Sequence, residues 1–85
     1  MPYVSKENRE KFAEFVASME QLKIEGPGDL NYLVTMLTHR YLNQEPESYQ
    51  MYNDAVGALE GAKLELYRRH IAPYENEKIR ENGDV

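Results

Sequence analysis

The residues whose chemistry stands out lie on one predicted helix, within a stripe that is otherwise apolar. Lys63 interrupts this stripe, and Tyr67 and Arg68 follow one turn later. A charged side chain on an apolar face must form an ion pair, extend to solvent or bind a ligand. Two interpretations stay open: a structural ion pair between Glu60 and Lys63, or a half-buried pocket for an anionic ligand. In such a pocket the tyrosine ring offers a stacking surface and the cations match phosphate oxygens.

The preceding predicted helix carries uncharged polar groups instead of the usual charges. Asn31, Thr35 and Thr38 lie on one side of it, and the helix has no acidic residue after Asp29, its expected cap. A helix that faces water normally carries charges there, so we expect this helix to be covered on more than one side. Its side chains could donate hydrogen bonds to a base or a ribose. The predicted ligand-binding residues are Asn31, Tyr32, Thr35, Lys63, Tyr67, Arg68 and Arg69.

Catalytic and metal sites are not predicted. The chain has no cysteine, and no serine lies within one helical turn of His39 or His70. Thr35 precedes His39 by one turn, but neighbours at this spacing arise often by chance. Two histidines without supporting carboxylates leave a zinc ion under-ligated. We therefore expect a protein that is not an enzyme, with no catalytic residue, no metal and no cofactor.

Length and charge exclude several further classes. A chain of 85 residues forms one small domain with a thin stability margin, which self-association would reinforce. Its net charge of −5 and lack of a basic face argue against generic nucleic-acid binding. It has no apolar run of about 20 residues for a membrane span. It has no secretory signal either, and the missing cysteines fit the cytoplasm.

The spacing of apolar residues predicts an all-α fold. It comprises three helices and a short C-terminal helical segment after Pro73, arranged as an antiparallel bundle in a single domain over residues 1–85. Ser5 and Ser48 are suitable N-caps, Asp29 is placed to cap the second helix, and Gly83 suits the end of the last segment. The predicted bounds are residues 5–23, 29–43, 48–72 and 73–82.

The third predicted helix is long enough to need a partner. Its roughly 25 residues span about 37 Å, more than either neighbouring helix. Leu66 and Ile71 at its far end need cover, and the simplest cover is a second copy of the chain. Gly57 and Gly61 lie on one face, which indicates a close helix crossing, either within the domain or at a dimer axis. Pro73 is expected to break or kink the helix.

Several stretches carry distinctive motifs and cover the chain from about Gly28 to its end. These stretches are Gly28–Tyr32 with Thr35, Ala55–Glu65, Tyr67–Arg69, Ala72–Glu75 and Glu81–Asp84. They resemble a family of small uncharacterised proteins found in phage, prophage and bacterial genomes, and they mark the family without indicating a chemistry. The resemblance implies a phage context, in which small oligomeric proteins often act against host defence.

Three hypotheses follow. The first is a homo-oligomeric binding protein, acting in the host cytoplasm if phage-encoded, that sequesters a small phosphorylated ligand such as a nucleotide immune signal. The second is an acidic protein–protein inhibitor or adaptor of a host protein, because acidic surfaces can occupy basic grooves. The third is a virion assembly factor.

Overall fold

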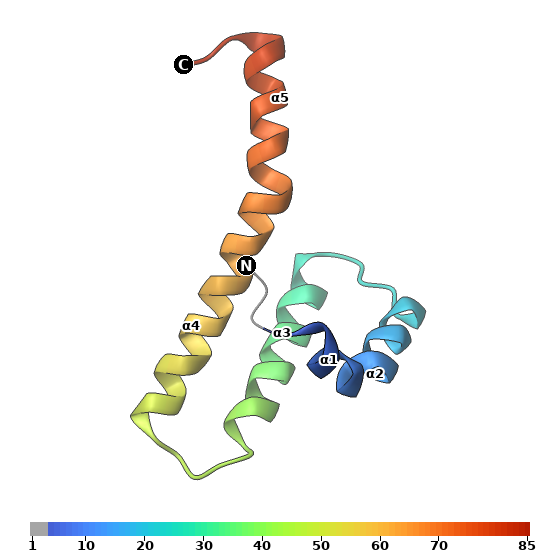
Figure 1. Ribbon diagram of the computed structural model, residues 1–85, viewed down its shortest axis with the longest axis vertical. Helices are drawn as coiled ribbons and strands as arrows, with labels where there is room; N and C mark the ends of the chain where they lie inside the picture. Colours follow the sequence, from blue (N-terminus) through green and yellow to red (C-terminus); the bar gives the residue numbers. More distant parts are fainter. Residues whose placement is uncertain (1–3) are drawn as a thin grey trace. The chain divides into compact units, whose positions relative to one another are not determined.

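The structure is a computed structural model that describes residues 4–85 (Figure 1). Every regular element over these residues is helical, which confirms the predicted all-α class. The chain divides into two units, residues 1–37 and 38–85, and each is described by itself. The antiparallel bundle therefore stays a prediction. None of the described helices is long and apolar enough to cross a membrane.

The first unit opens with a series of short helical turns where one helix over residues 5–23 is expected. The Ser5 hydroxyl caps the first turn by accepting the backbone N–H of Asn8 at 3.2 Å. At Phe12 the backbone adopts φ −106° and ψ 0°, outside the helical region, which interrupts the helix. The segments are α1 (Lys6–Arg9), the 3₁₀ turn η1 (Glu10–Phe12), α2 (Ala13–Ser18) and the 3₁₀ turn η2 (Met19–Gln21).

Helix α3 (Pro27–Leu42) begins two residues earlier than expected. Proline suits the first helical position, because its missing N–H would have no partner there. Asp29 does not cap the helix from outside. It lies in the first turn, and its carboxylate accepts the backbone N–H of Glu25 at 3.0 Å. This bond holds the loop that leads into α3.

Apolar side chains of α2, η2 and α3 line a shared hollow within the first unit. The expected apolar stripes of the first two predicted helices thus meet, although most of these side chains remain exposed. The hollow has a volume of about 260 Å³ and is lined by Phe15, Met19, Leu22, Leu33, Met36 and Leu37.

Helix α4 (Tyr49–Leu66) starts at a well-formed N-cap in the second unit. Ser48 has extended backbone angles, and its hydroxyl accepts the N–H of Met51 at 3.1 Å. A serine, threonine, aspartate or asparagine in this position satisfies a backbone donor that the helix leaves unpaired.

Replacing Ser48 by alanine is expected to lower the free energy of unfolding by about 1 kcal/mol, because the Met51 N–H loses its acceptor. Urea denaturation followed by circular dichroism, at one fixed protein concentration, measures the change. Ser48→Asn is the matched control, since asparagine restores a side-chain acceptor. If Ser48→Ala and Ser48→Asn lower the free energy of unfolding equally, Ser48 does not act as a cap.

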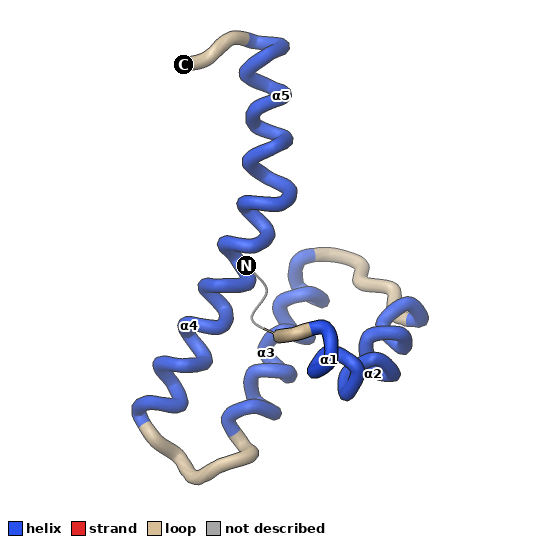
Figure 2. The backbone as a smooth tube through the Cα atoms, viewed as in Figure 1, coloured by secondary structure: helices blue, strands red, loops and turns tan. Residues whose placement is uncertain are grey.

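The sequence predicts that Pro73 breaks or kinks the helix; the α-helix is interrupted earlier, by a π-helical turn that begins at Tyr67, and helical structure continues through Pro73. Figure 2 shows one helical tube through α4, the π-helical turn η3 (Tyr67–Ile71) and α5 (Ala72–Asn82). The N–H of Ala72 bonds to the carbonyl of Tyr67, five residues earlier, as in a π-turn. A proline lacks the N–H and clashes with the preceding turn of an α-helix. The wider π-turn leaves room for the ring of Pro73, so helical structure continues through this residue.

The end of α5 matches the expectation from the sequence. Gly83 has a φ of 82°, the left-handed side that favours glycine, and its N–H bonds to the carbonyl of Ile79 at 2.8 Å. The glycine therefore closes the helix at a position where a side chain would strain the backbone.

Burial is low over the described residues. Among residues 4–85, Ala55 alone is buried, at 7% exposed. The large apolar side chains of α4, η3 and α5 remain partly or largely exposed. The apolar stripe expected for the third helix exists, but this unit does not cover it.

Candidate functional site

The cations predicted to bind a ligand lie at the end of α4 and in η3. Arg68 and Arg69 share one carboxylate oxygen of Glu65, with Arg68 Nη2 at 3.3 Å and Arg69 Nε at 2.6 Å. Their side chains are 61% and 51% exposed. We call Arg68, Arg69 and His70 the basic segment. Glu65 holds both guanidinium groups in place while most of their N–H donors still face outward.

Lys63 forms the ion pair that one interpretation of the sequence anticipated. Its Nζ lies 3.2 Å from Glu60 Oε1, and both side chains are largely exposed. The pair is therefore a surface pair of the kind that contributes little to stability. Tyr67 follows Lys63 by four residues, so the ammonium group and the half-exposed ring lie on one side of the helix.

The uncharged candidates lie in the first unit, on α3. Thr35 Oγ1 donates to Asn31 Oδ1 at 3.5 Å, the long end of hydrogen-bond distances. Tyr32 is exposed and lines a separate hollow of about 200 Å³ beside Leu22 and Asp29. The structure thus brings Asn31 and Thr35 together, whereas Tyr32 lines a hollow that neither of them lines. Lys63, Tyr67 and the two arginines belong to the other unit.

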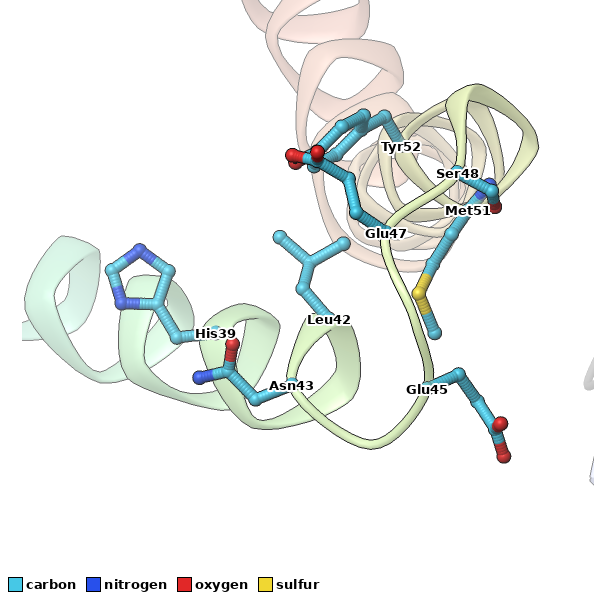
Figure 3. A pocket seen from close by; sticks show the side chains of 8 residues that line it. All are labelled: His39, Leu42, Asn43, Glu45, Glu47, Ser48, Met51 and Tyr52. Carbon is cyan, nitrogen blue, oxygen red and sulfur yellow. The ribbon is translucent and has the colours of Figure 1, made fainter.

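A pocket at the turn between α3 and α4 was not predicted from the sequence. It has a volume of about 290 Å³ (Figure 3). Two glutamates and a histidine line it, and none of its lining residues is a lysine or an arginine. The lining residues are His39, Leu42, Asn43, Glu45, Glu47, Ser48, Met51 and Tyr52.

The phenol of Tyr52 donates a short hydrogen bond to the Glu47 carboxylate in this pocket, where the two groups point toward one another (Figure 3). This bond raises the pKa of Tyr52 above its ordinary value of 10, with smaller contributions from desolvation and from the negative charge of Glu47. The tyrosine thus stays protonated and bonded over the neutral range. The pocket suits a cationic group rather than a phosphate.

Sequence reasoning missed this pocket because no periodic pattern marks it. Glu47 precedes the cap residue and Tyr52 lies in the first turn of α4, so their spacing follows neither a helix nor a strand. The available signal was two glutamates flanking Pro46 just before a serine cap. Within the described part of the chain, no three histidine, aspartate or glutamate side chains are grouped to hold a metal ion.

The model of one protein family, a domain of unknown function (DUF6899), matches residues 1–85. The match extends over the first 27 residues, which the resemblance noted from the sequence does not cover. No curated protein and no solved structure matches the chain. The expectation of a family without an assigned activity is confirmed at this level, and a phage origin stays a prediction.

Proposed function

The chain belongs to the DUF6899 family of domains of unknown function, and we propose that it is a non-enzymatic, homo-oligomeric protein that captures a small phosphorylated ligand. The observation that carries the proposal is the pair of exposed guanidinium groups on one Glu65 oxygen, with the half-exposed Tyr67 directly before them in the chain. A nucleotide combines the two features this arrangement fits, a phosphate and a flat base.

Electrostatics favours the basic segment as the place where a phosphate binds. The chain carries a net charge of −5, so an anion is repelled by most of the surface. Arg68 and Arg69 are adjacent and share one carboxylate oxygen. Each guanidinium has five N–H donors in a planar fork that matches phosphate oxygens. A phosphate therefore meets preorganised donors with little loss of side-chain freedom.

The tyrosine beside the cations supplies the second half of a nucleotide site. Bases stack on tyrosine rings with an energy of about 1–3 kcal/mol each. Tyr67 directly precedes the two arginines in the chain and lies one turn after Lys63, whose ammonium group pairs with Glu60. The π-turn starts at this tyrosine, and π-turns are frequent at functional sites.

The phage context implied by the sequence resemblance adds a biological role to the proposal. A protein that binds a nucleotide signal without converting it lowers the concentration available to a host defence system. Such a role needs tight binding and many copies, and it needs no catalytic group.

Native mass spectrometry of gently purified protein, with a panel of cyclic and linear nucleotides, tests this function. The expected result is an oligomer that gains a discrete mass of one or more nucleotides per assembly. The matching nucleosides, which lack phosphate, are the control and should add no mass. A protein that keeps its bare mass against the whole panel, or that binds nucleosides equally well, overturns the proposal.

A further inference from the structure

We propose that Asn82 is a covalent modification site, at which the chain deamidates by itself whenever the last turn of α5 opens. Asn82 is the final residue of α5, and its side chain is exposed. Gly83 follows it directly, and no other asparagine of the chain precedes a glycine. The reactants are these two residues and water, and the product carries an additional carboxylate at the end of α5.

The reaction needs a backbone nitrogen that can reach the side-chain amide of the preceding asparagine. The nitrogen of Gly83 loses its proton to base and attacks Cγ of Asn82. A bond forms between these two atoms, the bond from Cγ to the side-chain nitrogen breaks, and ammonia leaves after taking a proton from solvent. Water then adds to either carbonyl of the five-membered imide and opens it to an aspartyl or an isoaspartyl linkage. No oxidant and no enzyme take part.

The glycine that closes α5 is also the residue that makes Asn82 reactive. Without a Cβ, glycine leaves its nitrogen unhindered. Gly83 has a φ of 82°, which residues with a side chain rarely adopt. A Cβ built at this position would meet no atom within 4 Å, so space does not require glycine here. The backbone angle alone requires it, and the helix end therefore combines a cap with a labile bond.

The folded end of α5 keeps the reacting groups apart. The N–H of Gly83 donates to the carbonyl of Ile79 at 2.8 Å, so its proton is held. Asn82 belongs to the helix, where ψ is about −42°, and closure of the imide ring needs a different ψ at this residue. Both restraints end when the last turn opens, and helix ends open more readily than their middles. Opening of this turn therefore limits the rate of deamidation.

The product no longer closes the helix as Asn82 does. A carboxylate is unfavourable at the C-terminal end of a helix, where the macrodipole is negative, and Glu81 and Asp84 already flank this position. In the isoaspartyl product the main chain gains one atom, which displaces the Gly83 N–H from the Ile79 carbonyl. Each chain that reacts thus keeps an open α5 end, and its net charge becomes one unit more negative than −5.

Peptide mass spectrometry of the full chain, kept in mildly alkaline buffer with or without guanidinium chloride, tests this site. Conversion of the amide to an acid raises the mass of the peptide that contains Asn82, and chromatography separates the isoaspartyl form. In guanidinium chloride, Asn82 should convert at least about tenfold faster than Asn43, which also follows a helix and is exposed but precedes Gln44. In the folded chain, conversion of Asn82 should slow at least about fivefold.

Two controls separate the helix end from the chemistry. A peptide of residues 77–85, too short to keep a stable helix, should react equally fast in both buffers. Asn82→Gln retains the cap residue Gly83 but would have to close a larger ring, so it should show no conversion at this position.

Three results would overturn the proposal. An Asn82 that stays unmodified in guanidinium chloride is not a modification site. Equal rates in the folded and unfolded chains mean that the helix end does not control the reaction. A mass gain of the same size in Asn82→Gln assigns the reaction to another residue.

Discussion

Replacing Leu59 by aspartate is expected to convert the protein into a monomer with little cooperative structure. In a homo-oligomer formed through the apolar stripe of α4, each copy contributes its own Leu59, so a single substitution acts twice. Burying a leucine side chain contributes about 1.5–3 kcal/mol. An aspartate in its place would bring a desolvated carboxylate into the contact from each copy. The dimerisation constant should therefore fall on the order of 10³-fold or more.

Sedimentation velocity and circular dichroism, at equal protein concentrations, measure this effect. Leu64→Asp is the matched control, because Leu64 lies on the same helix, outside the apolar stripe of Tyr52, Val56, Leu59 and Leu66, and is similarly exposed (56% against 42% for Leu59). This control should remain dimeric and helical. A Leu59→Asp protein that stays dimeric, or a Leu64→Asp protein that dissociates as readily, would show that the helices associate through another surface.

The paired substitution Arg68→Ala with Arg69→Ala is expected to weaken nucleotide capture by about 10²- to 10⁴-fold. Hydrogen bonds to charged groups contribute about 1.5–3 kcal/mol each, and the variant removes both guanidinium groups. The fold should survive, because ion pairs as exposed as those with Glu65 contribute little to stability. Isothermal titration calorimetry measures the affinity, and circular dichroism checks the helical content.

The control for this variant must remove the same charge from elsewhere. Arg40→Ala with Arg80→Ala does so, since Arg40 lies on α3 and Arg80 pairs with Glu77 on α5. If the phosphate binds the basic segment, the control loses little affinity, through long-range electrostatics alone. Equal losses in the two double variants would mean that net charge, and not this site, governs binding.

Local rules explain why the helical class and the helix ends at Ser48 and Gly83 could be predicted from the sequence. A cap depends on one side chain and the next turn, so the sequence contains the necessary information. Pro73 shows the limit of such rules. Proline predicts a break in an α-helix, but a π-turn offers a second way to accommodate the ring, and the choice depends on surroundings that spacing does not reveal.

The candidate site could also be predicted only in part: its residues follow from the sequence, and their contacts do not. The sequence alone shows a cationic stretch, because Lys63, Arg68 and Arg69 lie close together in it, with Tyr67 between them. Helical spacing already places Glu65 three residues before Arg68 and four before Arg69. What the sequence does not specify is that both arginines select the same Glu65 oxygen. The pocket around Tyr52 and Glu47 depends on the path of a turn, which helical periodicity does not describe.

Ala55, the one buried residue among residues 4–85, has a consequence for the quantity of protein that a cell must make. If the chain forms the homo-oligomer we propose, association supplies much of its stability, and its folded fraction rises with concentration. Copies made slowly and in small numbers would be exposed to proteases, whereas a rapid burst of synthesis would pass the threshold and persist. Gene dosage and translation rate would then set the amount of folded protein.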